Sequence, residues 1–132
     1  IITPHPGEMN RLMPTATNLT RVEVIELISK KTKALTVFKG DRTLVKQAGS
    51  DLYINGTGTP GMATAGQGDL LTGIITGLCA QQYERTHATC MAAWLCGRAS
   101  EIACLHTAPE SLITSDTAQH LGVAFAEWNT SR

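Results

Sequence analysis

The chain has 132 residues, and its 11 Lys and Arg residues balance 11 Asp and Glu residues to a formal net charge of zero. This length suits one domain with a real hydrophobic core, and the charge balance argues against a nucleic-acid partner bound through a basic surface. No apolar run is long enough to span a membrane, and the N-terminus has no secretory signal. Because the sequence opens at Ile1 without a start Met and reads there like the end of a strand, we expect a piece of a longer protein.

The cysteines are spread without the spacing of a metal site. They form no Cys-x-x-Cys pair and have no clustered histidines, so we expect no protein metal site. Their surroundings are apolar and helix-like, and nothing indicates secretion. We therefore expect buried free thiols in a reducing cytoplasm. The four residues are Cys79, Cys90, Cys96 and Cys104.

The first half of the chain mixes helix and strand signals. Residues 3–8 hold two prolines and a glycine, so we expect a loop without regular structure there, and a short helix over residues 8–13 that Pro14 ends. Apolar residues at helical spacing predict a longer helix over residues 19–33. Runs of apolar and β-branched residues predict short strands at residues 34–38, 43–45 and 52–54.

The second half predicts helices. Residues 70–81 should form a helix that is buried on most sides, and residues 86–106 carry an apolar stripe at helical spacing. A last helix should begin near Ser115 and Asp116, which are suitable N-caps, and run to about Trp128. This order of elements predicts an α/β fold that is incomplete as a sheet, so residues 1–132 form a single partial domain.

The most informative segment is residues 58–69, Gly-Thr-Pro-Gly-Met-Ala-Thr-Ala-Gly-Gln-Gly-Asp, which leads into the helix predicted at residue 70. Glycines let backbone N–H groups approach a ligand closely. A helix N-terminus adds unpaired N–H donors and the positive end of the helix dipole, so the site favours phosphate. Asp69 then stands where a carboxylate can act as a base on an attacking hydroxyl. The segment predicts an active site that handles phosphate.

Two other motif patterns occur in and beside this segment. Residues 56–61 have Gly-x-Gly-x-x-Gly spacing, but Pro60 and further glycines delay the helix that a dinucleotide fingerprint opens directly. Residues 61–66 have the Walker A spacing without its Lys and Ser or Thr, which rules out a P-loop. The dinucleotide fold and a purely structural glycine turn stay open as alternatives.

Several separated segments follow the order found in one enzyme family. They are Thr3-Pro-His-Pro-Gly-Glu-Met-x-Arg-Leu12, Lys39-Gly-x-x-Thr43, Gly58-x-Pro-Gly-Met-Ala-Thr64, Gly66-x-Gly-Asp-x-Leu-Thr-Gly73 and Thr107-Ala-Pro-Glu-Ser-Leu112. With these segments the sequence resembles the nucleotide-dependent NAD(P)H-hydrate dehydratases of the ribokinase-like superfamily. The resemblance implies a three-layer α/β/α sandwich, of which this chain would be the C-terminal part only.

The resemblance also implies a reaction and roles for residues. ADP or ATP, with Mg²⁺, would drive the dehydration of hydrated NADH or NADPH back to the reduced cofactor. Asp69 would be the catalytic base and contact the substrate, and His5 would bind the hydrated nicotinamide. The nucleotide would lie against Lys39, Gly40, Asp41, Arg42, Thr43 and Gly68. The anion hole would be formed by Gly66, Gln67 and Gly68.

Two other function classes stay open at this point. A ribokinase-like kinase for small molecules would use the same anion hole and Asp69 but would stop at a phosphorylated product. A non-catalytic fragment would bind nucleotide without turnover. A parallel sheet that lacks strands leaves unpaired edges, so we expect as partner the missing N-terminal half, a second chain carrying it, or further copies in a homo-oligomer.

Overall fold

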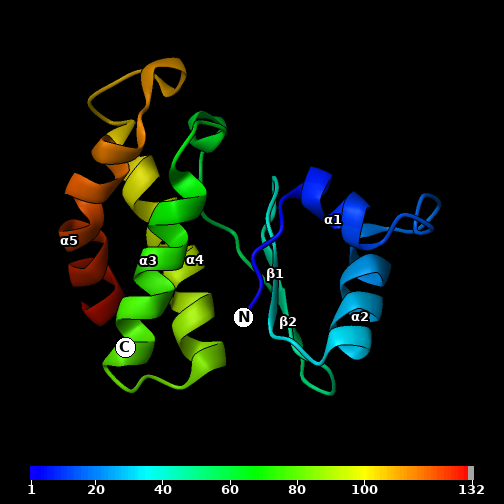
Figure 1. Ribbon diagram of the computed structural model, residues 1–132. Coiled ribbons are helices and arrows are strands. Elements are labelled where there is room, and N and C mark those ends of the chain that lie inside the picture. The colour runs from blue at the N-terminus through cyan, green and yellow to red at the C-terminus, as the bar shows by residue number, and fades with distance from the viewer. Residues whose placement is uncertain (131–132) are drawn as a thin grey trace. The chain divides into compact units, whose positions relative to one another are not determined.

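The computed structural model describes residues 1–130. Its residue contacts divide the chain into two compact units, Ile1–Asn55 and Gly56–Arg132, which we call the N-terminal unit and the helical unit (Figure 1). Each unit is described by itself. The mixture of helices and strands confirms the predicted α/β class.

The N-terminal unit consists of two helices and a small sheet. Its strands pair antiparallel in the order β1-β2-β3, with Val37 opposite Val45 and Val45 opposite Tyr53. Ile2 forms a parallel bridge to Thr36, in agreement with the strand character expected at the start of the chain. The elements are α1 (Pro6–Leu12), α2 (Arg21–Thr32), β1 (Thr36–Phe38), β2 (Leu44–Lys46) and β3 (Leu52–Ile54).

The core of this unit lies between its helices and one face of the sheet, as Figure 1 shows for α1 and α2. Apolar side chains of α2 that recur at helical spacing pack on this face because the opposite face of the helix is charged. Thr20 caps α2, and the Glu23 side chain accepts the backbone N–H of Thr20 at 2.8 Å in return. The buried cluster is Met9, Val24, Ile25, Ile28, Phe38 and Leu44.

The prediction that residues 3–8 lack regular structure is wrong at its end. Helix α1 begins at Pro6, with His5 as its N-cap. Proline is well suited to the first position of a helix, because its missing N–H would have no intrahelical acceptor there and its φ is already helical. Gly7 then lies in the first turn of α1 and not in a loop, and Glu8, at which we expected the short helix to begin, is inside α1.

The helical unit is built around α4 (Arg85–Ala103), which packs against α3 (Gln67–Ala80) and α5 (Thr114–Thr130). Small side chains let the neighbouring helices approach closely. Two short 3₁₀ turns, η1 (Pro60–Met62) and η2 (Pro109–Ser111), pack against each other. The buried apolar residues of α4 are Ala88, Met91, Ala92, Ala93, Leu95, Cys96, Ala99, Ile102 and Ala103.

Two helix starts differ from those predicted. Helix α3 begins at Gln67 and not at residue 70, so Asp69 lies inside its first turn. Helix α5 begins at Thr114, and Asp116 is its third residue, not its N-cap. The Asp116 carboxylate still accepts the backbone N–H of Ile113, at 3.1 Å, which satisfies a donor at the helix start. The observed helix starts differ from the predicted ones because caps depend on backbone geometry that composition does not specify.

All four cysteines are free thiols, as predicted. Cys96 is buried, whereas the other three are half-buried, so burial is less complete than expected. Burial raises the pKa of the Cys96 thiol to about 12, and burial together with the charge of Glu84 raises that of Cys90 to about 11. Within residues 1–130 we find no helix that is both long and apolar enough to cross a membrane.

Candidate active site

The predicted site residues fall in both units. His5 and the segment from Lys39 to Thr43 belong to the N-terminal unit, and the segment from Gly66 to Asp69 belongs to the helical unit. The structure brings together the members of each group, and the two groups are described in turn.

The N-terminus of α3 presents unpaired backbone donors. Gly66 is the N-cap, with φ of +89°, and no side chain caps the helix. The first helical N–H with an acceptor is that of Leu70, which donates to the Gly66 carbonyl at 3.0 Å. In the part of the chain that the structure describes, the N–H groups of Gln67, Gly68 and Asp69 have no acceptor. Three such donors at the positive end of a helix dipole suit an anion.

Asp69 adds a carboxylate at the same helix start. It is the acidic residue of the first turn of α3 and its side chain is exposed. Within residues 1–130 it has no hydrogen-bond or ion-pair partner. A carboxylate without a protein partner, next to free amide donors, is available to a hydroxyl group or a cation that arrives with an anionic ligand.

The Gln67 side chain points away from this helix start. It is buried, and its Nε2 donates to Thr117 Oγ1 of α5 at 2.9 Å. Thr117 Oγ1 lies 3.0 Å from Ser100 Oγ, which donates to the Cys96 carbonyl of α4 at 2.8 Å. This side chain therefore holds α3 against the other two helices. Any part of Gln67 in an anion hole is its backbone N–H.

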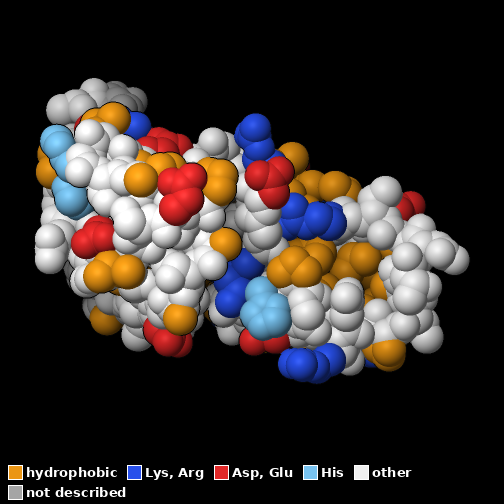
Figure 2. All heavy atoms as spheres, turned by 90° about the horizontal axis from the view of Figure 1, so that it is seen from above, with side chains coloured by type: hydrophobic (Ala, Val, Ile, Leu, Met, Phe, Trp, Pro, Cys, Tyr) orange, Lys and Arg blue, Asp and Glu red, His pale blue; other side chains and the backbone are white. Residues whose placement is uncertain are grey.

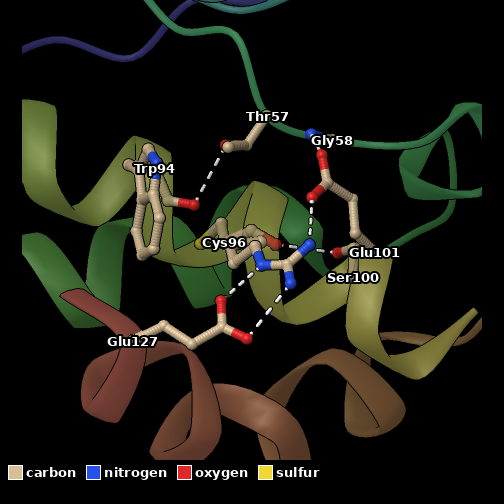
Figure 3. A network of polar contacts seen from close by, with 8 residues as sticks. Thr57, Gly58, Trp94, Cys96, Ser100, Glu101 and Glu127 are labelled. Carbon is tan, nitrogen blue, oxygen red and sulfur yellow. Dashed lines mark hydrogen bonds and ion pairs between the residues drawn. The ribbon is translucent and has the colours of Figure 1, made fainter. Parts of the chain in front are cut away.

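The loop that leads to α3, residues 57–66, is attached at its start to α4. Thr57 Oγ1 donates to the Trp94 carbonyl at 3.0 Å, and the Gly58 N–H donates to Glu101 Oε1 at 2.7 Å (Figure 3). Arg98 Nη1 donates to Glu101 Oε2 at 2.9 Å. Gly58 has φ of +129°, a backbone conformation that residues with a side chain rarely adopt.

The same loop is attached at its middle and end to the segment before and at α5. A Cβ on Gly61 would overlap the Pro109 carbonyl oxygen of η2 and stand 3.1 Å from Leu112 Cβ, so only glycine fits here. At the end of the loop, Thr114 Oγ1 donates to the Ala65 carbonyl at 2.6 Å. The position of the α3 amides is therefore fixed by contacts to α4, η2 and α5.

In the N-terminal unit, Glu8 links two predicted site residues. The His5 N–H donates to Glu8 Oε2 at 2.7 Å, and the Glu8 N–H donates to His5 Nδ1 at 3.3 Å, which forms a capping box. Lys39 Nζ lies 3.9 Å from Glu8 Oε2. The hydrogen bond from the His5 backbone, with smaller contributions from the charges of His5 and Lys39, lowers the pKa of the Glu8 carboxyl.

The segment from Lys39 to Thr43 connects β1 to β2 and is held by Arg21. Arg21 Nη2 donates to the carbonyls of Phe38 and Lys39, both at 3.2 Å, and the guanidinium lies 4.8 Å from the centre of the Phe38 ring. A Cβ on Gly40, whose φ is +149°, would stand 2.7 Å from Arg21 Nη2. Asp41 and Arg42, which follow this held end, are exposed.

The comparisons with known proteins identify the family. The Carb_kinase family model, described as NAD(P)H-hydrate dehydratase, matches residues 1–121. The chain belongs to this family. It is 38% identical over 124 residues to the bifunctional NAD(P)H-hydrate repair enzyme Nnr of Moorella thermoacetica, a match that covers 92% of this chain and 23% of that protein.

Solved structures confirm the predicted ribokinase-like fold. The ADP/ATP-dependent NAD(P)H-hydrate dehydratase from Bacillus subtilis, co-crystallised with ATP/Mg²⁺, matches with a TM-score of 0.89 and 27% identity over 96% of this chain and 47% of that chain. A ribokinase-like superfamily protein from Enterococcus faecalis matches with a TM-score of 0.79 and 27% identity over 96% of this chain and 44% of that chain. The chain thus spans a little under half the length of these solved proteins.

Several residues that shape this region were not found from the sequence. Glu101, Thr114 and Arg21 each bond to the backbone of a segment that is distant along the chain. The one available signal was the charged pair of Arg98 and Glu101, spaced by three residues on an otherwise apolar predicted helix. Gly58, the loop residue that bonds to Glu101, lies too far away in the sequence for periodicity to reveal the contact.

Proposed function

We propose that this chain takes part in the ADP- or ATP-dependent dehydration of hydrated NADH or NADPH, which restores the reduced cofactor. The proposal rests on one observation above all: three unpaired backbone N–H groups stand beside the partner-free carboxylate of Asp69. This arrangement suits transfer of a phosphoryl group to a hydroxyl. Family membership and a related solved enzyme that is named as ADP/ATP-dependent support it.

The proposed chemistry explains why a nucleotide is needed. Hydroxide leaves a ring carbon poorly, whereas a phosphate ester leaves readily. The oxygen of the substrate hydroxyl attacks the terminal phosphorus of the nucleotide while Asp69 takes the hydroxyl proton. The bond between that phosphorus and the bridging oxygen of the nucleotide breaks. The ring nitrogen lone pair then expels phosphate, and loss of a ring proton restores the double bond. The N–H groups of Gly68 and its neighbours offset the charge on the transferred group.

The residues also fit a nucleotide-bound Mg²⁺. Within the described residues no cluster of three or more His, Cys, Asp or Glu side chains is able to hold a metal ion. Mg²⁺ is commonly bound through one or two carboxylates plus substrate phosphates, so the exposed carboxylate of Asp69 suffices on the protein side. When bound, the ion would neutralise charge on the phosphates.

The remaining predicted contacts are proposals of the same kind. We propose that His5 contacts the hydrated nicotinamide, and that the turn from Lys39 to Thr43 contacts the nucleotide together with Gly68. The exposure of Asp41 and Arg42, in a turn whose start is held by Arg21, supports this role. Lys39 is close to Glu8, so an anionic ligand would compete with that carboxylate for the lysine.

We further propose that the protein is cytoplasmic and that these residues assemble with further polypeptide, either the rest of the domain or other chains. The free thiols support a reducing compartment. Because the chain spans a little under half of the solved relatives, we propose that the rest of a single domain, or a second chain carrying it, completes the site. Hydrophobic side chains at the surface support a homo-oligomer (Figure 2). The most exposed are Leu105, Ile54, Ile113 and Val123.

The test is an assay of the whole protein with hydrated NADH and hydrated NADPH, each with ADP or ATP and Mg²⁺. We expect reduced nicotinamide to appear, followed by its absorbance, only when nucleotide is present. Accumulation of a phosphate ester on an alcohol without release of reduced cofactor would instead identify a kinase. Nucleotide binding without any turnover would contradict the proposed reaction.

A further inference from the structure

We propose that Glu101 is a positioning residue for the α3 helix start: its carboxylate fixes the loop of residues 57–66 so that the amides of Gln67, Gly68 and Asp69 are held in place for phosphate. This inference rests on the proposed function. It assigns a role in that site to a residue on α4, outside the segments that the sequence singled out.

The contact between Glu101 and the loop is direct and charge-assisted. The Gly58 N–H donates to Glu101 Oε1 at 2.7 Å, in a helix whose buried face is packed along most of its length. A carboxylate accepts a backbone N–H more strongly than a neutral oxygen does. Because Gly58 has φ of +129°, its own conformational freedom is large, and an external partner has to select one geometry.

The second oxygen of Glu101 is held as well. Arg98 Nη1 donates to it at 2.9 Å, and the remaining guanidinium nitrogens donate to Glu127 of α5, Nε to Oε2 at 2.5 Å and Nη2 to Oε1 at 3.1 Å. Figure 3 marks these bonds to the carboxylates of Glu101 and Glu127 with dashed lines. Bonds to these two carboxylates raise the pKa of Arg98, so the arginine stays charged. The Glu101 carboxylate is therefore oriented by Arg98 independently of its bond to the loop.

The loop transmits this constraint to the candidate site. It is short, and its far end is held where Thr114 bonds to the Ala65 carbonyl and where Gly61 fits under η2. Contacts near both ends of the loop thus hold the residues that lead to the N-cap at Gly66. Loss of the Glu101 carboxylate removes the bond to the Gly58 N–H, so the loop holds the amides that follow Gly66 less tightly.

A purely structural role would give a different result, and Glu127 provides the matched comparison. Glu127 lies on α5, and both of its carboxylate oxygens accept hydrogen bonds from the same arginine. If the network served only to join α4 and α5, loss of either glutamate would lower stability, and the two variants would have the same kcat. A positioning role predicts that only loss of Glu101 changes the site.

The experiment compares Glu101→Ala with Glu127→Ala in the whole protein. We expect both variants to melt at lower temperature, but only Glu101→Ala to lose kcat, by about 10- to 100-fold, because small displacements of catalytic groups are costly. In parallel, backbone amide NMR should show shifted resonances of residues 67–69 in Glu101→Ala and not in Glu127→Ala. Equal kinetics and equal amide spectra in the two variants would overturn the inference.

Two controls keep the test decisive. Should Glu101→Ala not fold, Glu101→Gln replaces it, since its one side-chain oxygen cannot serve both Gly58 and Arg98, and it should still lose more kcat than Glu127→Gln. Absence of turnover in the unchanged protein would contradict the proposed function. In that case the amide resonances of residues 67–69 alone decide the role of Glu101.

Discussion

Gly97 of α4 lies directly against Thr57, the first residue of the loop that leads to α3. A Cβ at position 97 would stand 2.6 Å from the Thr57 carbonyl carbon and nearer still to its hydroxyl oxygen. Real Cβ atoms do not approach backbone this closely, and the loop lies flat on the helix only because residue 97 has no side chain. The close approach also lets Thr57 Oγ1 reach the Trp94 carbonyl.

Gly97→Ala should therefore destabilise the protein, although alanine favours helices. Overpacking at a fixed backbone contact costs about 1–3 kcal/mol, more than the gain in helix propensity of about 1 kcal/mol. Gly77→Ala is the control, since a Cβ there meets nothing and should raise stability slightly. Denaturant unfolding of both variants checks this. Gly97→Ala as stable as Gly77→Ala would contradict the contact.

Asp69→Asn should nearly abolish turnover in the whole protein. If the carboxylate accepts the substrate proton, its loss costs about 10²–10⁴-fold in kcat. Nucleotide binding should largely survive, because the unpaired amides of the first turn of α3 remain. Steady-state kinetics and calorimetry with ADP or ATP separate the two effects. A variant that kept most of the wild-type rate would remove Asp69 from the role of base.

Gly68→Val should block nucleotide binding at the start of α3. The added side chain would cover the amides of the first turn, where we propose that phosphate binds. Gly73→Val is the matched control, because it lies on the same helix and a Cβ there meets nothing. Calorimetry with ATP should show lost affinity for the first variant alone. Equal affinities would mean that the glycine segment serves folding only.

The thiols should react with iodoacetamide at unequal rates. Burial raises the pKa of Cys96 to about 12 and that of Cys90 to about 11, so at neutral pH almost no thiolate is present at either position. Cys79 and Cys104 are half-buried and should be modified first. Mass spectrometry of digests over time gives the order. Early modification of Cys96 in folded protein would contradict its burial.

Stability should fall in acid, in part through Glu127. Its hydrogen bonds from Arg98 lower the pKa of this carboxyl below its ordinary value of 4.5. Its ionised form is thus favoured by folding, so its contribution is present above about pH 4.5 and is lost as pH falls through the lowered pKa. Glu127→Gln should reduce stability at neutral pH and flatten the acid decline. Thermal melting between neutral and acidic pH measures both effects.

The exposed Glu110 supplies the control for that experiment. Its side chain is exposed in η2, with no ion pair or side-chain hydrogen bond in the described residues. Glu110→Gln should leave the profile of melting temperature against pH almost unchanged. An equally flattened profile in Glu110→Gln and Glu127→Gln would show that the pairing with Arg98 does not carry the effect.

Much of the fold follows from periodicity, because repeated spacing reports which face of an element is buried. The order of helices and strands was predicted correctly, and the segments that resemble the dehydratase family led to the family that the comparisons confirm. Helix starts were predicted less well. Pro6 and Gly7 were assigned to a loop on composition, although the cap provided by His5 allows a helix to begin at Pro6.

The candidate site was predictable only where its residues are adjacent in sequence. The glycine segment and Asp69 predicted an anion site at a helix start, and the unpaired amides agree with that geometry. The buried direction of the Gln67 side chain and the bond from Gly58 to Glu101 depend on how α3, α4 and α5 pack. Such contacts join residues far apart along the chain, where local pattern carries no information.

The attachment of the glycine loop to three separate segments links ligand binding to the rigidity of the whole helical unit. A ligand that binds the α3 amides stabilises the arrangement of the loop in which they are held. It therefore also stabilises the contacts of the loop with Trp94, Glu101 and Thr114. Occupancy of the site should thus slow hydrogen exchange far from the ligand, along α4 and at the first turn of α5. A bound phosphate would be recorded in the protection of helices that it never touches.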